Sequence, residues 1–356
     1  MFINRLGTAE IMEDMMSQST AKEKLRLAKR RSFDPQHQEW VKTSFLNANS
    51  SLPLIISPAI NGVNLSRWAS QNQNWIESSL YQYGGLLFRG FEIQNTGDFA
   101  QFSQATSQGE LLEYTYRSTP RTQLQDKIYT STEYPPDQFI SMHNENAYST
   151  SWPMKIWFCC LQPAQHGGET LIADSRKVFE RIDPKVRQKF AEKKVMYIRN
   201  YGDVDLSWQE VFQTSERSDV EAYCRQSGIE FEWKRGEKLR TRQVCQAIAT
   251  HPKTGTHVWF NVAHIFHISN LALDVQKSLL SLFEAEDLPR HACYGDGSPL
   301  EVSVLNEIRE AYQAETIAIP WQKGDILMLD NMLVAHGRKP FTGARQVVVG
   351  MAEPYC

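Results

Sequence analysis

The chain has 356 residues, with 38 basic and 41 acidic side chains and a formal net charge of −3. This balance gives no reason to expect a nucleic acid as a partner, and no apolar run approaches the roughly 20 residues that a membrane span needs. The six cysteines form no Cys-x-x-Cys pair, and the N-terminus lacks the form of a signal peptide. We therefore expect a cytoplasmic globular protein with reduced, mostly buried cysteines. Nothing in the sequence predicts its oligomeric state.

The first fifty residues are the least informative segment. They contain a dense basic run, KEKLRLAKRR, at residues 22–31. We interpret it as a solvated helix face, with a docking patch for an acidic partner as the alternative. No internal repeat or low-complexity linker divides the rest. We therefore predict an N-terminal extension over residues 1–50, flexible or helical, and a single domain over residues 51–356.

From about residue 52 onward, short strand patterns alternate with helical ones. Helical periodicity is found at residues 65–83, 99–114, 178–190, 220–226, 271–284 and 302–312. Strand patterns are found at residues 86–88, 156–161, 170–173, 195–198, 243–249, 257–262, 316–319, 326–329, 333–336 and 346–351. Many short strands separated by turn signals favour a double-sheet β architecture over a βαβ sheet. We predict a mainly β fold, a jelly roll with helical elaborations.

The triplet His143-Asn144-Glu145 is the first candidate for chemistry. In an extended segment, residues i and i+2 project to the same face, so the imidazole and the carboxylate would converge. An isolated His-x-Glu triplet is weak evidence, because a surface histidine beside a solvated glutamate gives the same pattern. No His-Glu-x-x-His segment is present, which excludes the commonest zinc-protease geometry.

Two residues near the C-terminus strengthen the metal hypothesis. His336, in the expected strand LDNMLVAHGRKPF, is the natural third ligand. Two histidines and one carboxylate leave open coordination positions, the arrangement that suits non-haem Fe(II) oxygenases. Arg345 begins the following strand and can form a bidentate pair with the distal carboxylate of 2-oxoglutarate. Taken alone, Arg345 would read as a surface arginine after a turn.

These segments together resemble the taurine dioxygenase family of Fe(II)/2-oxoglutarate oxygenases, in particular its clavaminate synthase-like and biosynthetic amino-acid hydroxylase branch. The resemblance runs from about residue 84 to the C-terminus. Its motifs are HNE at 143–145, GGETLIAD at 167–174, HPKTG at 251–255, WFN at 259–261 and HGRKPFTGAR at 336–345. Their order and spacing are far more specific than any one motif.

The resemblance implies a double-stranded β-helix, which is a jelly-roll core, with His143, Glu145 and His336 as the catalytic metal ligands. It implies that Thr170 joins Arg345 in holding 2-oxoglutarate, and that Fe(II), 2-oxoglutarate and O₂ are the cofactors. The implied activity is hydroxylation of an unactivated carbon in a small amino-acid-like substrate, with desaturation or ring closure as alternatives. The substrate would be free or tethered to a carrier protein, in the biosynthesis of a specialised metabolite.

The chain departs from taurine dioxygenase at the substrate position. Taurine dioxygenase has a second arginine, four residues after the co-substrate arginine, that grips the sulfonate. This chain has Val349 there, and positions 345, 347 and 349 share one face of a strand, so Val349 should face the pocket that Arg345 serves. The sulfonate clamp is therefore missing, and we do not expect taurine as the substrate. Glu145 replaces the aspartate of many relatives, as is common in the amino-acid hydroxylase branch.

Several other residues allow two interpretations. His264 and His267 could mimic a metal pair, but the resemblance places them near the substrate mouth in a structural or lining role. Phe266 is a candidate pocket wall or a core aromatic. The remaining residues are Cys159 and Cys160, interpreted as core cysteines, and Arg89 and Arg338, which would contact substrate or pair internally.

Two rival functions remain open at this stage. A mononuclear zinc hydrolase could use the same His143, Glu145 and His336, but hydrolysis gives no reason for Arg345 and Thr170. A non-catalytic jelly-roll binding protein would be favoured by a missing ligand, and none is missing. Succinate release with bound Fe(II) separates the three functions.

Overall fold

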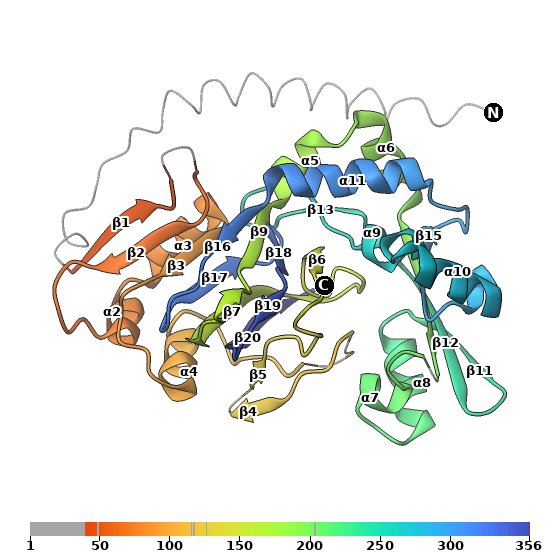
Figure 1. Cartoon of the computed structure of the whole chain (residues 1–356), viewed down its shortest axis with the longest axis horizontal. Coiled ribbons are helices and arrows are strands. Elements are labelled where there is room, and N and C mark those ends of the chain that lie inside the picture. The colour runs from red at the N-terminus through yellow and green to blue at the C-terminus, as the bar shows by residue number, and fades with distance from the viewer. Residues whose placement is uncertain (1–39, 48–49, 115, 117, 126, 203) are drawn as a thin grey trace. The chain divides into compact units, whose positions relative to one another are not determined.

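The computed structural model describes residues 40–356 apart from 48–49, 115, 117, 126 and 203 (Figure 1). The basic run at residues 22–31 lies outside the described residues. The compact unit runs from Val41 to Cys356. It begins at Val41 rather than at residue 51, because the first strand is already paired in the main sheet.

The largest sheet has eight strands. Their order is β1 (Val41–Phe45), β2 (Leu54–Pro58), β3 (Gly85–Phe88), β17 (Ile326–Asp330), β7 (Trp152–Gln162), β20 (Gln346–Tyr355), β5 (Ile128–Thr130) and β4 (Gln123–Gln125). The neighbouring strands are antiparallel except β2 and β3, which are parallel. β17, β7 and β20 come from distant parts of the sequence and lie side by side at its centre (Figure 1).

A second sheet of four antiparallel strands faces the centre of the first. Its order is β16 (Ile317–Ile319), β9 (Thr170–Asp174), β18 (Val334–Arg338) and β6 (Ile140–His143). The ring of Phe158 on β7 lies 5.0 Å from the ring of His336 on β18, measured between centroids. Side chains of the two sheets therefore meet between them, and the expected double-sheet, mainly β architecture is confirmed.

Three smaller sheets complete the strands. One contains β11 (Glu230–Lys234), β12 (Lys238–Cys245), β10 (Val195–Tyr201) and β15 (Arg290–Tyr294) in that order. The other two are the pairs β13 (Ile248–Thr250) with β14 (His257–Trp259), and β8 (His166–Gly167) with β19 (Phe341–Thr342). The strand expected over residues 243–249 is thus divided between β12 and β13.

The helices largely follow the periodicity of the sequence. They are α2 (Leu65–Gln71), α3 (Gln73–Tyr83), α4 (Thr96–Ala105), α5 (Ser175–Arg181), α6 (Pro184–Lys193), α7 (Trp208–Phe212), α8 (Arg217–Gln226), α9 (Ala263–Phe266), α10 (Leu273–Leu282) and α11 (Val302–Glu315), with 3₁₀ turns η2 (Ile268–Asn270) and η3 (Ala285–Asp287). Three expected helices were wrong in extent. The helix over 65–83 is broken at Asn72, the one over 178–190 is broken before Pro184, and the one over 99–114 ends at Ala105.

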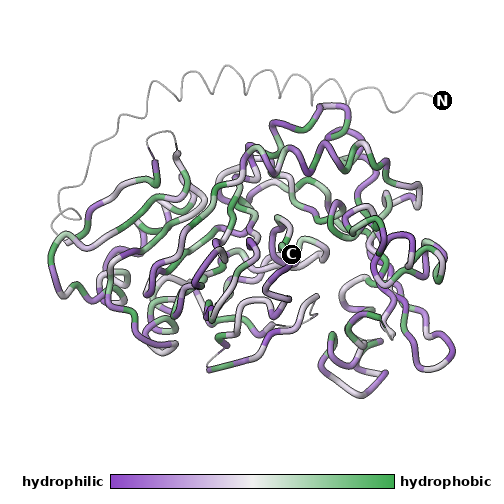
Figure 2. The backbone as a smooth tube through the Cα atoms, in the orientation of Figure 1, coloured by the Kyte–Doolittle hydropathy of each residue, from purple (hydrophilic) through white to green (hydrophobic). Residues whose placement is uncertain are grey.

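The core has two layers, one on each face of the large sheet. Along β17, Leu327 and Leu329 belong to the layer between the sheets, whereas Ile326 and Met328 belong to the layer under α3 and α4. Because successive side chains point to opposite faces, a strand buried on both sides reads as a continuous apolar run. Figure 2 shows this central strand as hydrophobic. No helix in the described part of the chain is both long and apolar enough to span a membrane.

Candidate active site

His143 and Glu145 leave the second sheet at the end of β6. His143 is the last residue of the strand, and Glu145 lies in the turn that follows it rather than in an extended segment. The two side chains nevertheless converge. Glu145 is almost fully buried, with 2% of its surface exposed. An isolated buried carboxylate is costly, so a cation is expected beside it.

His336 completes the group from the adjacent strand. In the register of β18 and β6 it is the direct partner of His143, and the two ring centroids are 4.4 Å apart. Its Nε2 lies 3.9 Å from Oε2 of Glu145. One ligand atom from each of the three residues lies within 4.8 Å of the other two. The structure therefore brings together the three side chains that the sequence singled out.

The protonation of the two rings fits a transition metal. Nδ1 of His143 lies 2.8 Å from the carbonyl oxygen of Ser141. An N–H donated there leaves Nε2 with a free lone pair, the usual arrangement of a metal-binding histidine. Burial lowers the pKa of His143 despite the nearby Glu145 carboxylate. Burial, the His143 ring and Arg121 hold the pKa of His336 well below its usual range. Both rings are therefore neutral at pH 7, as ligands must be.

Asn331, in the turn after β17, fixes the position of the Glu145 backbone. Its Oδ1 accepts a hydrogen bond from Glu145 N at 2.7 Å, and its Nδ2 donates to the carbonyl oxygens of Glu145 and Pro153, both at 2.9 Å. Asn144 returns the contact, donating from Nδ2 to the Asn331 carbonyl at 2.6 Å. The sequence analysis did not predict this role of Asn331.

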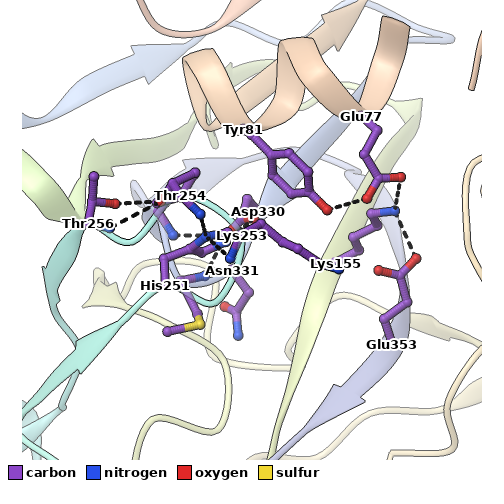
Figure 3. Close-up of polar contacts among 12 residues, drawn as sticks. Glu77, Tyr81, Lys155, His251, Lys253, Thr254, Thr256, Asp330, Asn331 and Glu353 are labelled. Atoms are coloured by element: carbon purple, nitrogen blue, oxygen red, sulfur yellow. Dashed lines mark hydrogen bonds and ion pairs between the residues drawn. The ribbon is translucent and has the colours of Figure 1, made fainter. Parts of the chain in front are cut away.

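The HPKTG segment, residues 251–255, contacts the neighbouring Asp330. Nε2 of the fully buried His251 lies 2.9 Å from Oδ2 of Asp330. Nδ1 of His251 accepts hydrogen bonds from the backbone N–H groups of Lys253 and Thr254, so Nε2 carries a proton and donates to Asp330. Figure 3 shows this contact beside Asn331. The motif thus supports the turn behind the site.

A cavity lined by three arginines opens beside the two histidines. Phe158 and Val347 line it from the large sheet, and the second sheet contributes His336 and Thr170. Its other lining residues are Arg121, Ser131, Thr132, Ile140, His143, Gly337, Arg338 and Arg345. No carboxylate is among these described residues, so we call it the anion cavity. Its size and charge suit a small dianion that reaches the candidate metal ligands.

Arg345 and Thr170 both lie in the anion cavity. Arg345 donates from Nε to the Gly168 carbonyl at 3.1 Å, and the hydroxyl of Thr170 accepts from Nε1 of Trp321 at 3.0 Å. Burial and the adjacent Arg338 lower the pKa of Arg345 to about 10, still well above neutrality. A partly buried guanidinium that has no carboxylate partner among the described residues favours an incoming anion.

A second cavity is lined by His143 and Glu145. Its walls include Phe266, Tyr148 and Ile265, and the other charged side chain in its lining is that of Arg290. Phe266 stacks on Tyr148 with centroids 5.6 Å apart. We call this space the substrate cavity, because it reaches the candidate metal ligands through His143 and Glu145, whereas the anion cavity reaches them through His143 and His336. Phe266, for which a pocket wall and a core aromatic were the two alternatives, lines this cavity and also packs in the core.

The remaining candidates have structural contacts. Val349 was expected to face the pocket that Arg345 serves. It is buried in the same core layer as Val347, but it is not among the described residues that line either cavity. His264 lies 3.0 Å through Nε2 from the Met142 carbonyl, and His267 caps η2 through Nδ1, so both act in the fold.

The two arginines left open by the sequence have different environments. Arg89 pairs with Asp325 at 2.6 Å. Of the two alternatives for Arg89, substrate contact and internal pairing, the structure therefore shows internal pairing. Arg338 lines the anion cavity but donates to the carbonyls of Tyr134, Pro135 and Gln138. Cys159 and Cys160 are free and buried, as expected of core cysteines.

The fold and this arrangement define a class of protein. The model of the taurine catabolism dioxygenase TauD, TfdA family matches residues 49–352, and the chain belongs to that family. It is an Fe(II)- and 2-oxoglutarate-dependent dioxygenase that uses O₂. The dioxygenase expectation is confirmed over the hydrolase and the non-catalytic binding protein.

Particular relatives are similar over most of the chain. The dapdiamide synthesis protein DdaC of Enterobacter agglomerans is 44% identical over 280 residues, covering 78% of this chain and 85% of the relative. A clavaminate synthase-like protein of Arabidopsis thaliana is 28% identical over 317 residues, covering 86% and 91%.

Solved structures confirm the jelly-roll fold. PvcB of Pseudomonas aeruginosa, described as an Fe, alpha-ketoglutarate dependent oxygenase from an isonitrile synthetic pathway, superposes with a TM-score of 0.54 at 13% identity, covering 90% of this chain and 93% of that chain. A putative alpha-ketoglutarate dependent 2,4-D dioxygenase from Burkholderia xenovorans gives a TM-score of 0.52 at 15% identity, covering 88% and 96%.

Proposed function

We propose that the chain hydroxylates an unactivated carbon of a small amino-acid-like substrate during biosynthesis of a specialised metabolite. The observation that carries the proposal is that both cavities reach the group formed by His143, Glu145 and His336: His143 lines both, His336 lines the anion cavity and Glu145 lines the substrate cavity. A metal held there meets the co-substrate on one side and the substrate on the other. The similarity to a dapdiamide synthesis protein supports a biosynthetic, amino-acid-related role.

In this proposal, Nε2 of His143, a carboxylate oxygen of Glu145 and a ring nitrogen of His336 hold Fe(II). Two neutral imidazoles and one carboxylate are a donor set that non-haem Fe(II) uses, and it leaves coordination positions open. Bound iron supplies the activation of O₂, coupled to oxidation of 2-oxoglutarate to succinate and CO₂. The protein contributes binding, orientation and exclusion of water.

Arg345 and Thr170 bind the distal carboxylate of 2-oxoglutarate. The guanidinium supplies charge-assisted hydrogen bonds, and the Thr170 hydroxyl can donate to the carboxylate while accepting from Trp321. Phe266 and Tyr148 form an apolar wall that orients the target carbon toward the metal. Val349 occupies the position at which a sulfonate clamp would have its second arginine. The proposed substrate is therefore one other than taurine.

Carrier presentation of the substrate is a second part of the proposal. The substrate cavity is continuous with a wider surface hollow, because Ile265, Phe266 and Arg290 line both. A substrate on a long tether can enter through such an opening, and so can a free amino acid. The two differ in the length of chain that fills the hollow.

The test is a substrate panel assayed by mass spectrometry. Purified protein with Fe(II) and 2-oxoglutarate is offered free amino acids and the same aminoacyl groups on a carrier protein. We expect one group of substrates to gain one oxygen atom, or to lose two hydrogens, with one succinate formed per turnover. Protein loaded with Zn(II) serves as the control and should form no succinate. Hydrolysed products without succinate would contradict the proposal.

A further inference from the structure

Arg121 is a buried guanidinium at the site that the roles assigned so far do not use. Its Nη2 donates to Oε2 of Glu145 at 2.8 Å, and both side chains are 3% exposed. The guanidinium also lies over the ring of Tyr114, 4.4 Å from its centroid. Arg121 thus contacts a candidate metal ligand directly, from a segment just before β4.

Most of the donors of Arg121 are still available. Nε and Nη1 are buried and have no hydrogen-bond acceptor among the described residues. A guanidinium carries five N–H donors, and buried donors are normally paired. Two unpaired nitrogen atoms beside a ligand cavity therefore indicate that an acceptor is brought by the ligand.

The anion cavity connects Arg121 with Arg345. Both line it, together with His143 and His336. The third arginine, Arg338, is committed to three backbone carbonyls. Arg121 and Arg345 are therefore the cations of this cavity with the most donors left for a ligand.

2-Oxoglutarate has a carboxylate at each end. If Arg345 and Thr170 hold the distal carboxylate, the carboxylate beside the keto group must lie near the metal ligands. Arg121 is hydrogen-bonded to one of those ligands, Glu145. We infer that Arg121 is a second anchor for 2-oxoglutarate, binding the carboxylate beside the keto group while it holds Glu145 in place. This inference rests on the proposed function.

The competing role for Arg121 is that of a counter-ion to Glu145 alone. Arg121→Lys separates the two roles, because lysine keeps a positive charge for Glu145 but loses the Nε and Nη1 donors. Arg89→Lys is a matched control, since Arg89 also pairs with a buried carboxylate, Asp325, outside the anion cavity. Arg121→Gln is a second variant that lacks the charge, and circular dichroism shows which variants are folded.

The experiment is an anaerobic titration of the Fe(II)-saturated protein with two keto acids, followed by the visible absorption band of the keto-acid chelate. One is 2-oxoglutarate, and the other is 2-oxopentanoate, which lacks the distal carboxylate. We expect Arg121→Lys to weaken both by at least about tenfold, the scale of a lost charge-assisted contact. Arg345→Gln should weaken 2-oxoglutarate only, and Arg89→Lys should match the wild type.

Fe(II) affinity, measured without a keto acid, completes the test. We expect it to change by less than about threefold in Arg121→Lys, because the ion pair with Glu145 is retained. Keto-acid affinities equal to wild type in folded Arg121→Lys or Arg121→Gln would overturn the inference and leave Arg121 as a counter-ion. If the wild-type protein itself forms no chelate with 2-oxoglutarate, the proposed function fails as well.

Discussion

At the scale of single residues, a substitution of Arg345 distinguishes binding of the co-substrate from binding of the metal. Arg345→Gln removes the positive charge that, in the proposed binding mode, pairs with the distal carboxylate in the anion cavity. Breaking a buried charged hydrogen bond costs on the order of 2–5 kcal/mol. We therefore expect a large rise in the KM for 2-oxoglutarate, with Fe(II) affinity nearly unchanged, measured by succinate formation and by anaerobic metal titration.

Lys339→Gln is the control for Arg345→Gln. Lys339 lies close in sequence, is 45% exposed and pairs weakly with Glu169 at 3.7 Å. Its loss removes the same charge without removing a ligand contact, so the KM should stay near the wild-type value. An unchanged KM in Arg345→Gln would assign the distal carboxylate to another group.

The candidate residues that the sequence identified and the structure brings together are those whose chemistry can be recognised from short segments. His143 and Glu145 are two positions apart, the pairing of β18 with β6 brings His336 beside His143, and Arg345, just before β20, lines the anion cavity with both histidines. Arg121 was missed because its link to Glu145 spans 24 residues and depends on a tertiary contact. No acidic residue lies within four positions of Arg121 in the sequence, so no local pattern indicated that it pairs with Glu145.

At the scale of elements, the turn after β17 holds the turn after β6, which carries the proposed metal ligand Glu145. Asn331→Ala would leave the Glu145 N–H and two buried carbonyls without their partner. Each unpaired buried group costs about 1–3 kcal/mol. We expect a lower free energy of unfolding in the metal-free protein, measured with urea, and a weaker affinity for Fe(II).

Two further variants sharpen the Asn331 test. Asn331→Asp keeps the acceptor for Glu145 N–H but loses the donors, so its effect on stability shows which contacts matter. Asn306→Ala changes an asparagine on the surface of α11 and should leave both quantities unaltered. Wild-type Fe(II) affinity in Asn331→Ala would mean that the turn does not position Glu145.

Element boundaries were the weakest part of the sequence prediction, for local reasons. The backbone of Asn72 leaves the helical region between α2 and α3, although the apolar periodicity continues through it. Pro184 begins α6, and because proline disfavours helical geometry in the residue before it, the helix over 178–190 is divided there. β17 was placed well, since it is a short apolar run flanked by turn residues, whereas β7 extends beyond the expected range 156–161 at both ends and β18 is shifted from the expected range 333–336.

At the scale of the whole molecule, buried histidines make stability depend on pH. Burial, the neighbouring His291 and Arg309 lower the pKa of His267 to about 4. The unfolded chain takes up this proton near pH 6.5, whereas the folded chain does so only near pH 4. The unfolded state therefore binds more protons between these values, and the free energy of unfolding falls as the pH decreases through this window.

His267→Asn tests this dependence. Asparagine keeps a side-chain acceptor for the Ser269 N–H, which His267 Nδ1 accepts at 3.1 Å, but it does not titrate. We expect a smaller slope of unfolding free energy against pH between about 4 and 6.5, measured by urea unfolding. The slope will not vanish, because burial also lowers the pKa of His264, to about 3. A slope identical to that of the wild type would show that His267 titrates normally in the folded state.

The molecule-scale architecture was predictable because the C-terminal strands are regular. What the sequence could not give is the pairing of β6, β9 and β18 with their partners, on which both cavities depend. Strand pairing between distant segments is decided by the packing of the two sheets. The sequence also could not give the start of the compact unit at Val41, because β1 is defined by its pairing with β2.

The measurement that tests the central claim most directly is anaerobic addition of Fe(II) and 2-oxoglutarate to the wild type, His143→Ala, His336→Ala and His257→Ala. His257 is exposed and lies outside the ligand group, so it controls for loss of a histidine. We expect the visible band of the chelate in the wild type and in His257→Ala. We expect it to be absent in the other two variants, with tight Fe(II) binding lost in both. A normal band in folded His143→Ala or His336→Ala would contradict the assignment of His143, Glu145 and His336 as the iron ligands.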